Sequence, residues 1–346
     1  MNELSDAVKR CDGAISGVLD LGDLSLGRFA HASYVAVSAM AWWLLSAPEP
    51  PTQVAFLTKA QQSILQRTGV VEACRVRGIP IVAPPELMTS SAQRLEGTDW
   101  SAFTGSPLPR HAALISDLAS PLNRPPDPDE HGRRYQWVQP LVGVQRGMSR
   151  RDRNLAASDG ARCLFEFVDN VQRWAQADRG TAVVYRTRGG GPDSFDRLHV
   201  VVMDSGRGII ASVLDDPDAR ASMPGDLADN PTGLLLHFLK KAFGDREIPH
   251  HSGHGLHISQ MLADVWIGRI DVLSSDHREP GLVHHARSTV HDGVEPCPSF
   301  TMPGIAGTLA SITLNLVAPT SDLRERIEDD EQAERHEQPK LFVTTS

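Results

Sequence analysis

Apolar residues at helical spacing mark one long helix in the second half of the chain. Ser158 and Asp159 are suitable N-caps, and apolar residues recur every three or four positions from there to about Ala177. Two apolar, β-branched runs follow at 182–187 and 198–203, and the glycine-rich segment between them predicts a hairpin. The remaining periodic segments predict helices at 232–242 and 255–265 and strands at 269–274 and 308–316. Helices that alternate with a largely antiparallel sheet predict a two-layer α/β sandwich.

The first part of the chain carries a weaker α/β pattern. Residues 29–48 contain no Asp, Glu, Lys or Arg, and a membrane span is one interpretation of such a stretch. Because it contains His31 and three serines and depends on alanine for much of its apolar character, a buried core helix is favoured. A strand at 54–58, a helix at 59–68 and a strand at 79–83 follow, and no residue cluster in this part indicates catalysis.

Composition divides the chain into segments. Residues 121–135 hold four prolines among charged residues and predict a linker, because proline restricts its own backbone and that of the residue before it. The linker separates a smaller α/β domain at 1–120 from a larger one at 136–317. Residues 318–346 are rich in Glu, Asp, Arg and Gln, which is typical of a frayed helix or an acidic polar tail.

Charge and cysteine usage limit the classes of partner and compartment. A net charge of −9 argues against a general electrostatic attraction to nucleic-acid phosphates. Four widely spaced cysteines exclude a disulfide framework, and the N-terminus lacks the apolar segment of a signal peptide, so a cytoplasmic location is expected. A local basic run is interpreted as solvated residues preceding the long helix and consists of Arg146, Arg150, Arg151 and Arg153.

A carboxylate and a carboxamide lie four residues apart in the long helix. Glu166 and Asn170, in the sequence EFVDN, point to the same helical face one turn apart. Such a pair can hold a hydrated Mg²⁺ through the amide while the acid takes a proton from a nucleophile. Ordinary polar residues on a helix surface are the alternative interpretation.

Two glycine-containing turns lie at element boundaries. DSGRGI directly follows a predicted strand, which places Asp204 at the strand end, where Gly206 and Gly208 let the backbone approach a ligand closely. A tight structural turn is the alternative. GHGLHI opens a predicted helix, so Gly253 and Gly255 expose backbone N–H groups to an anion, helped by the positive end of the helix dipole.

These three patterns, in this order, resemble the N, G1 and G2 boxes of the GHKL superfamily, which includes the DNA gyrase B subunit, heat-shock chaperones, histidine kinases and MutL. EFVDN is similar to the E-x-x-x-N of the N box, DSGRGI to D-x-G-x-G and GHGLHI to G-x-G-L-x-I. Downstream, WIGRIDVLSS resembles the G-G-x-I-x-V-x-S strand of kinase-type members, with Ile267 in place of the first glycine. Gly307 and Thr308 resemble a G-T pair before the last strand. The resemblance covers about 150–316 and implies the Bergerat ATP-binding fold, with ATP and Mg²⁺ as ligands.

The resemblance also implies roles for single residues. Glu166 would be the general base, and Asn170 would hold Mg²⁺ through its side-chain oxygen. Asp204 would accept a hydrogen bond from the adenine amino group, with Thr308 beside it through a water. Residues 211–252 would form the lid. The other implied binding residues are Gly206 and Gly208 at the adenine pocket, Gly253 and Gly255 against the phosphates, and Leu256 in the same G2 box.

The implied activity is γ-phosphoryl transfer from Mg-ATP, to water or to a protein serine, in regulatory partner switching. Histidine kinases commonly lack a glutamate at the place of Glu166. Gyrase, MutL and heat-shock chaperones use it to activate water, and anti-sigma-factor serine kinases, the most similar group in pattern, use it on a serine hydroxyl. Arg173 stands where many relatives have an acidic residue, which weakens inferences about the adenine side. A non-catalytic, ATP-gated interaction switch is the alternative function.

The first part of the chain gives a hint about partners. Residues 54–74 faintly resemble STAS domains, the usual partners of anti-sigma-type kinases, although the usual phosphoacceptor motif is missing. The N-terminal domain is therefore interpreted as a degenerate STAS-like domain, with an unassigned α/β domain as the alternative. The implied partners are ATP and a regulatory protein of the STAS-like or sigma/anti-sigma type. A homodimer is compatible with this interpretation, whereas a membrane or nucleic acid is not expected.

Two groups of histidines invite a metal-site interpretation. In the first, two members fall in the implied lid and two in the G2 box, so no zinc site is expected; they are His250, His251, His254 and His257. The second group lies in the insertion at 276–303, where solvated side chains are expected, and consists of His284, His285 and His291.

Overall fold

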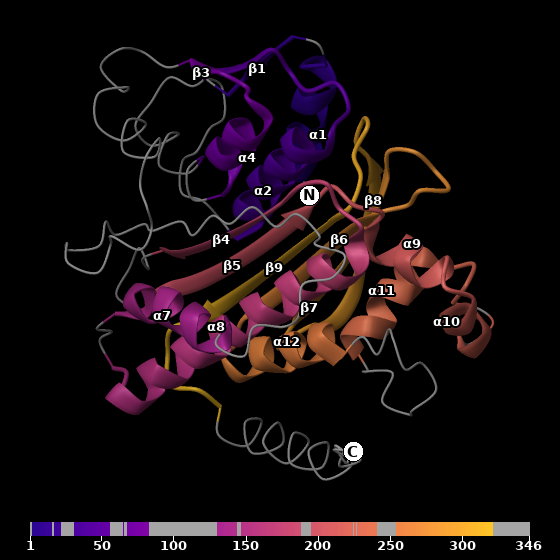
Figure 1. The fold of residues 1–346 in the computed structure, drawn as a ribbon. Coiled ribbons are helices and arrows are strands. Elements are labelled where there is room, and N and C mark those ends of the chain that lie inside the picture. The colour runs from indigo at the N-terminus through magenta and orange to yellow at the C-terminus, as the bar shows by residue number, and fades with distance from the viewer. Residues whose placement is uncertain are drawn as a thin grey trace, which may run out of the picture.

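The structure is a computed structural model that describes residues 2–15, 17–21, 31–55, 65, 68–82, 130–143, 147–187, 195–223, 225, 227–240 and 254–320. The described chain is a mixed α/β protein built around a six-stranded antiparallel sheet (Figure 1). Helices lie on both faces of this sheet, and a three-stranded parallel sheet lies at the outer side of the N-terminal helices.

The central sheet has the strand order β4-β5-β9-β6-β7-β8, and every neighbouring pair is antiparallel. Its strands are β4 (Gly180–Thr187), β5 (Arg197–Asp204), β6 (Arg269–Ser275), β7 (Leu282–Thr289), β8 (Gly293–Thr301) and β9 (Thr308–Asn315). The strand β5 is a nearly continuous apolar run because both of its faces are covered. Val200 and Val202 face one hydrophobic core, and the alternate residues Val201 and Met203 face another.

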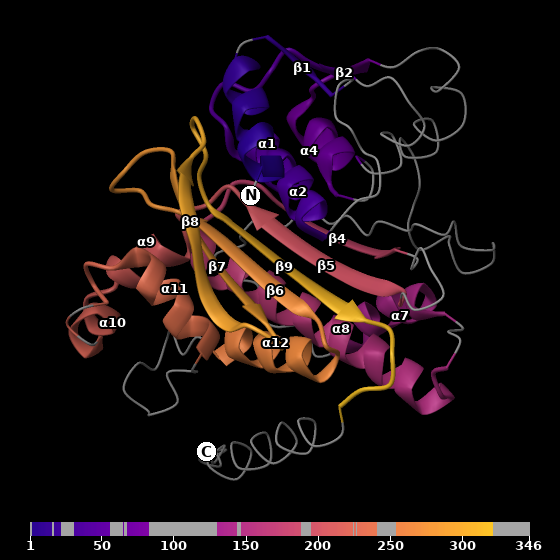
Figure 2. The same ribbon diagram turned by 180° about the vertical axis from the view of Figure 1, so that it is seen from behind.

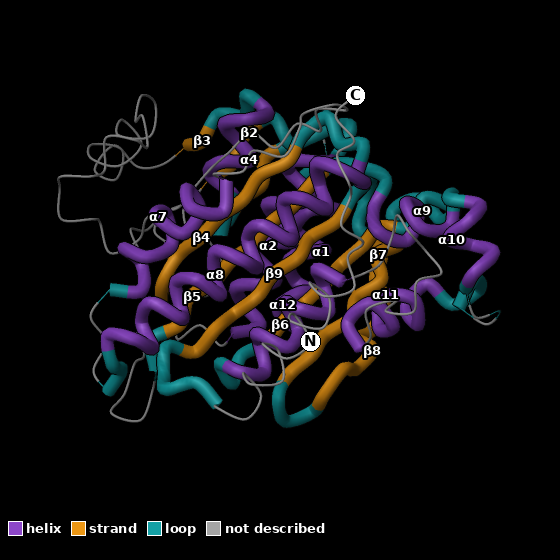
Figure 3. The backbone as a smooth tube through the Cα atoms, turned by 60° about the horizontal axis from the view of Figure 1, so that its bottom comes forward, coloured by secondary structure: helices purple, strands orange, loops and turns teal. Residues whose placement is uncertain are grey.

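One face of the sheet carries the helices that follow the predicted linker. They are α7 (Glu130–Val142), α8 (Arg150–Asn170), α9 (Gly208–Leu214), α10 (Pro217–Ser222), α11 (Pro231–Lys240) and α12 (His254–Val265), and α8 continues into a π-helical turn, η2 (Val171–Ala175). The helices α8 and α12 lie over the middle of the sheet, and α11 lies over β7 and β8 (Figure 3).

The other face is covered by the N-terminal part of the chain (Figure 2). Its elements are α1 (Asn2–Gly13), β1 (Val18–Asp20), α2 (His31–Ser46), β2 (Gln53–Ala55), α4 (Val70–Arg77) and β3 (Ile81–Val82), with the strands parallel in the order β1-β2-β3. The helix α2 packs on β5 and β9, and its Trp42 and Trp43 join a core that includes Met203 and Leu309. The N-terminal elements and the sheet therefore share one hydrophobic core, which adds a third layer to the two that were predicted.

The helix α8 begins earlier than the sequence pattern predicts. Its N-cap is Ser149, whose Oγ accepts the Asp152 N–H at 3.0 Å while the Asp152 carboxylate accepts the Ser149 N–H at 3.1 Å. This capping box satisfies two backbone donors and fixes the start of the helix. The prediction that the arginine run precedes the helix is therefore wrong for Arg150, Arg151 and Arg153, which lie in its first turn, whereas Arg146 lies outside the described residues.

The segment 276–303 was interpreted as an insertion with solvated histidines, and that prediction is wrong for His284 and His285. It folds into the antiparallel hairpin β7–β8, which extends the central sheet to its edge. His284 and His285 are only 7% and 3% exposed, because one faces α11 and the other pairs with a buried aspartate, whereas His291 is exposed as expected. Two prolines in β8 are tolerated because the strand is at the sheet edge.

The remaining element predictions agree with the structure where it describes them. Residues 31–46 of the apolar segment 29–48 form the helix α2, which is buried from Val35 on, and among the described helices none has the length and apolar character that crossing a bilayer requires. The predicted helix 59–68 lies outside the described residues, apart from residues 65 and 68. The boundary at residue 120 lies outside them too, and α7 occupies the last residues of the predicted linker.

Candidate functional site

The end of α8 carries the carboxylate and carboxamide pair that the sequence singles out. Glu166 and Asn170 lie one turn apart in the last turn of the helix, and both side chains are half-buried. The helix then widens into the π-helical turn η2, a local geometry that often marks functional sites. Arg173, in η2, donates to the Asp169 carboxylate at 2.7 Å in an exposed ion pair, so it binds its own helix surface.

The end of β5 holds the carboxyl group of Asp204 in the interior. The residue is 2% exposed, and the carboxyl accepts the backbone N–H of Gly206 at 2.7 Å and that of Thr308. Burial raises the pKa of Asp204 to about 7, against the opposing effect of these two backbone donors. Near neutral pH this group can therefore act both as an acceptor and, when protonated, as a donor.

Glycines surround Asp204 at places where a side chain would not fit. A Cβ on Gly206 would lie 2.1 Å from the carbonyl oxygen of Ala175, and one on Gly307 would lie 2.0 Å from the carbonyl oxygen of Asp204. Gly208 and Gly307 also have φ angles of +81° and +95°, which glycine adopts without strain. The glycines thus let three chain segments pack directly on one another and fix the position of the carboxyl group.

Hydroxyl groups on neighbouring strands hold the turn after Asp204. The Oγ1 of Thr308 accepts the Ile209 N–H at 3.2 Å, and Ser274 lies 3.4 Å from the Ile210 N–H. Ser275 accepts the N–H of Gly307 at 2.9 Å and donates to its carbonyl oxygen at 3.2 Å. The sequence analysis did not name Ser274 and Ser275 as site residues, although they end the WIGRIDVLSS match. Two hydroxyl side chains at the end of a predicted strand were the signal that could have identified them.

The start of α12 lies against the side chain of Glu166. A Cβ on Gly255 would be 2.6 Å from Glu166 Oε2 and 3.1 Å from its Cβ, so the missing side chain leaves room for the carboxylate. Leu256, the next residue, is 4% exposed and anchors α12 in the core. Gly253 and the last part of the implied lid, 241–252, lie outside the described residues.

The predicted site residues thus fall into two groups on one side of the sheet. Asp204, Gly206, Gly208 and Thr308 form the group at the ends of β5 and β9, and Glu166 and Gly255 form the group between α8 and α12. The turn η2 joins the groups, because Ala175 accepts the Arg207 N–H at 2.9 Å while it continues the helix that carries Glu166 and Asn170. Their roles toward a ligand stay predictions.

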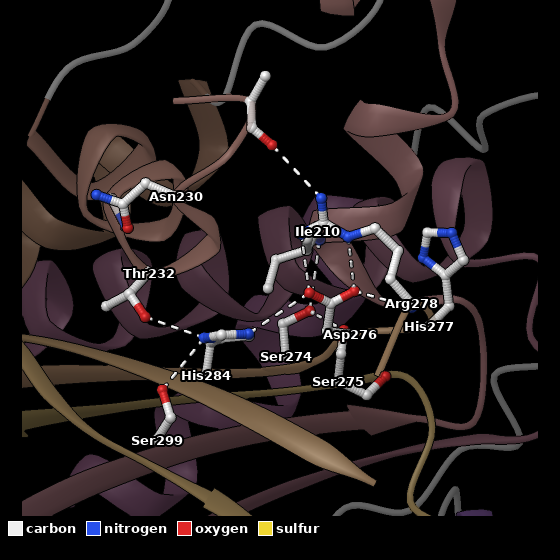
Figure 4. Close-up of polar contacts among 12 residues, drawn as sticks. Ile210, Asn230, Thr232, Ser274, Ser275, Asp276, His277, Arg278, His284 and Ser299 are labelled. Atoms are coloured by element: carbon white, nitrogen blue, oxygen red, sulfur yellow. Dashed lines mark hydrogen bonds and ion pairs between the residues drawn. The ribbon is translucent and has the colours of Figure 1, made fainter. Parts of the chain in front are cut away.

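A second polar cluster continues from β6 to α11 (Figure 4). Asp276, 2% exposed, accepts the backbone N–H of Arg278 at 3.0 Å and its Nη2 at 2.9 Å. Burial alone would raise the pKa of Asp276, but the hydrogen bonds and charge of Arg278 lower it below its ordinary value. His284 Nδ1 lies 3.0 Å from the Thr232 hydroxyl and 3.2 Å from that of Ser299, while its Nε2 makes only a 3.5 Å electrostatic contact with Asp276.

This cluster packs α11 onto the β7–β8 hairpin and borders the turn after Asp204 through Ser274. Burial lowers the pKa of His284, so its neutral form is favoured at neutral pH. Among the described residues, no group of three or more His, Cys, Asp and Glu side chains could hold a metal ion. Of the first histidine group, His257 hydrogen bonds through Nδ1 to the Leu239 carbonyl at 3.2 Å, and the side chains of the other three are not described.

The chain matches no protein-family model, and no curated protein matches it at a significant level. The interpretation of the site therefore depends on its motifs and on the geometry that brings them together.

Proposed function

We propose that the chain binds Mg-ATP at this site and transfers the γ-phosphoryl group, to water or to a protein serine, in regulatory partner switching. The observation that carries the proposal is the packing of the DSGRGI turn, the Gly307–Thr308 pair and η2 around the buried carboxyl of Asp204, where Gly206 and Gly307 leave no room for a side chain. This arrangement is what the Bergerat fold of the GHKL superfamily uses for an adenine pocket.

The donor and acceptor groups of the described residues fit an adenine nucleotide. The buried Asp204 carboxyl suits an amino group and adjacent ring nitrogen, because a buried acceptor is most favourable when a donor reaches it. The first turn of α12 offers backbone N–H groups without an intrahelical acceptor, and the positive end of the helix dipole, to phosphates. Gly255 leaves that helix end open toward Glu166.

The pair on α8 fits magnesium and proton transfer. Mg²⁺ keeps several waters and binds through one or two protein oxygens together with substrate phosphates, so the single amide oxygen of Asn170 is sufficient. When bound, the ion would neutralise charge on the phosphates of the transition state. Glu166 would accept the proton of the attacking water or serine hydroxyl, while the N–H groups of α12 hold the phosphates in position.

A non-catalytic, ATP-gated interaction switch is the second candidate. It is favoured by the hydrophobic core that the N-terminal helices share with the strands carrying Asp204 and Thr308. Through such a core, nucleotide binding could alter the N-terminal surface without any turnover. In either case the proposed partner is a regulatory protein of the STAS-like or sigma/anti-sigma type.

The fate of the γ-phosphate tests the proposal. Purified protein is incubated with γ-labelled ATP and Mg²⁺, and the label is followed as free phosphate and as phosphoserine. Glu166→Gln should lower either product at least about 100-fold while ATP affinity changes little. Asp169→Asn is the matched control, since Asp169 lies on the same helix and pairs with the exposed Arg173, and it should retain activity. Bound ATP without any product would favour the switch, and absent ATP binding would refute both candidates.

A further inference from the structure

One buried tryptophan of the N-terminal layer bonds to both segments that present the candidate adenine site. The Nε1–H of Trp42, on α2, lies 2.9 Å from the carbonyl oxygen of Asp204 and 2.9 Å from that of Ala306. Asp204 ends β5, and Ala306 precedes the pair Gly307 and Thr308 at the start of β9. A single donor shared by two acceptors thus fixes the spacing of two segments that are far from α2 in the sequence.

The position of Trp42 couples it to the carboxyl group of Asp204. Its ring is fully buried, so its N–H must be satisfied inside the protein, and the two carbonyls are the partners that do so. The same Asp204 carbonyl oxygen would lie 2.0 Å from a Cβ on Gly307, while the Asp204 carboxyl accepts the Thr308 N–H. A shift of the indole would therefore change how Asp204 and Thr308 face a bound base.

We propose that Trp42 is a positioning residue for adenine recognition, through which the N-terminal helical layer controls nucleotide affinity. The inference rests on the proposed function, since it needs the pocket beside Asp204 to bind adenine. It makes the N-terminal layer a regulatory element: a partner that moves α2 relative to the sheet changes the spacing of the two segments. The reverse holds by linkage, so a bound nucleotide strengthens the docking of α2.

The neighbouring Trp43 provides a matched control. It lies on the same helix, is equally buried, and donates one hydrogen bond, to the carbonyl oxygen of Pro303 at 2.8 Å. Replacing either tryptophan by phenylalanine removes an indole N–H and part of a buried ring. Only at Trp42 does the change reach the carbonyl of Asp204.

The test is calorimetric titration of ATP, ADP and inorganic tripolyphosphate into the wild type, Trp42→Phe and Trp43→Phe, with urea unfolding of each. Trp42→Phe should lower the affinity for ATP and ADP about tenfold and leave the affinity for tripolyphosphate unchanged, because the defect lies at the adenine base. Trp43→Phe should change each of the three affinities less than about twofold, although its free energy of unfolding should fall by a similar amount. If Trp42→Phe does not fold, the benzothienylalanine analogue at position 42 keeps the ring shape and removes only the N–H.

Three results would overturn the inference. Equal loss of ATP affinity in both variants would make the effect a general consequence of core damage. Equal loss of ATP and tripolyphosphate affinity in Trp42→Phe would place the defect away from the base. A wild type that binds tripolyphosphate and no adenine nucleotide would instead refute the proposed function, and the role of Trp42 with it.

Discussion

Asp204→Asn should remove the part of the pH dependence of the protein's stability that comes from this carboxyl group. The replacement keeps the shape of the side chain and removes its ionisation. In the folded protein, burial raises the carboxyl pKa from an ordinary 3.8 to about 7. Between these values the folded state binds a proton that the unfolded state has lost, so the Asp204 contribution to stability falls as pH rises from about 4 to about 7.

The size of this effect follows from the two pKa values. At about 1.4 kcal/mol per pH unit, ionising the buried carboxyl costs the folded state roughly 4 kcal/mol at pH 8, as an upper limit. The carboxamide of the variant carries no such cost, so the free energy of unfolding of the variant relative to the wild type should rise by up to that amount between pH 4 and pH 8. Any loss of hydrogen bonding to the amide is independent of pH, so it changes the free energy of unfolding of the variant by the same amount at pH 4 and at pH 8.

Urea unfolding of both proteins at pH 5, 6, 7 and 8 measures the difference. Taking the difference between variant and wild type cancels the histidines and other groups that titrate in the same window. A difference that stays constant across the series would show that Asp204 is already ionised in the folded protein at pH 5. That result would refute the argument that burial raises the pKa of the Asp204 carboxyl group.

Two further substitutions test the packing of α12 and of the central sheet. Ile267 lies two residues after the end of α12 with a φ of +50°, where a β-branched residue is strained, so Ile267→Gly should be about 1 kcal/mol more stable than Ile267→Ala in urea unfolding. An ordinary helical position would give the opposite order. Asp271→Asn should lower the free energy of unfolding by about 3–5 kcal/mol at pH 7, because it removes a buried charge from its partners. Asp271 is 1% exposed, and its carboxylate accepts hydrogen bonds from Arg269 at 2.7 Å, His285 at 2.9 Å and Arg287 at 3.1 Å. Burial alone would raise the pKa of Asp271, but these partners hold it well below its ordinary value. The loss of unfolding free energy in the variant should therefore shrink as pH falls below about 4. A loss that does not change with pH would contradict this.

Local patterns predicted the strands and helices that carry the site. The run before Asp204 predicts β5 because its residues are apolar and β-branched, and the spacing of Glu166 and Asn170 places them on one face of α8. Asp204 at a strand end and Gly255 at a helix start follow from the same patterns. These features depend on residues within about ten positions of one another, which is the range over which periodicity acts.

Long-range packing was not predictable in the same way. The bond from Trp42 to Asp204 joins residues 162 positions apart, and nothing near either one indicates the other. The burial of His285 depends on Asp271 of the neighbouring strand, so the polar segment around it looked solvated in isolation. The start of α8 was misplaced because Ser158 and Asp159 resemble a cap, whereas the capping box at Ser149 lies upstream of the apolar pattern.

Calorimetric titration of ATP into the wild type and Asp204→Asn, in the presence of Mg²⁺ and with GTP as the comparison, tests the central claim most directly. The carboxamide offers one acceptor oxygen where the carboxyl has two, and backbone N–H groups already use this end of the side chain. We expect the wild type to bind ATP more tightly than GTP, and the variant to lose about 10- to 100-fold in ATP affinity with GTP affinity unchanged. Equal ATP affinity in the two proteins, or no ATP binding by the wild type, would contradict an adenine site at Asp204.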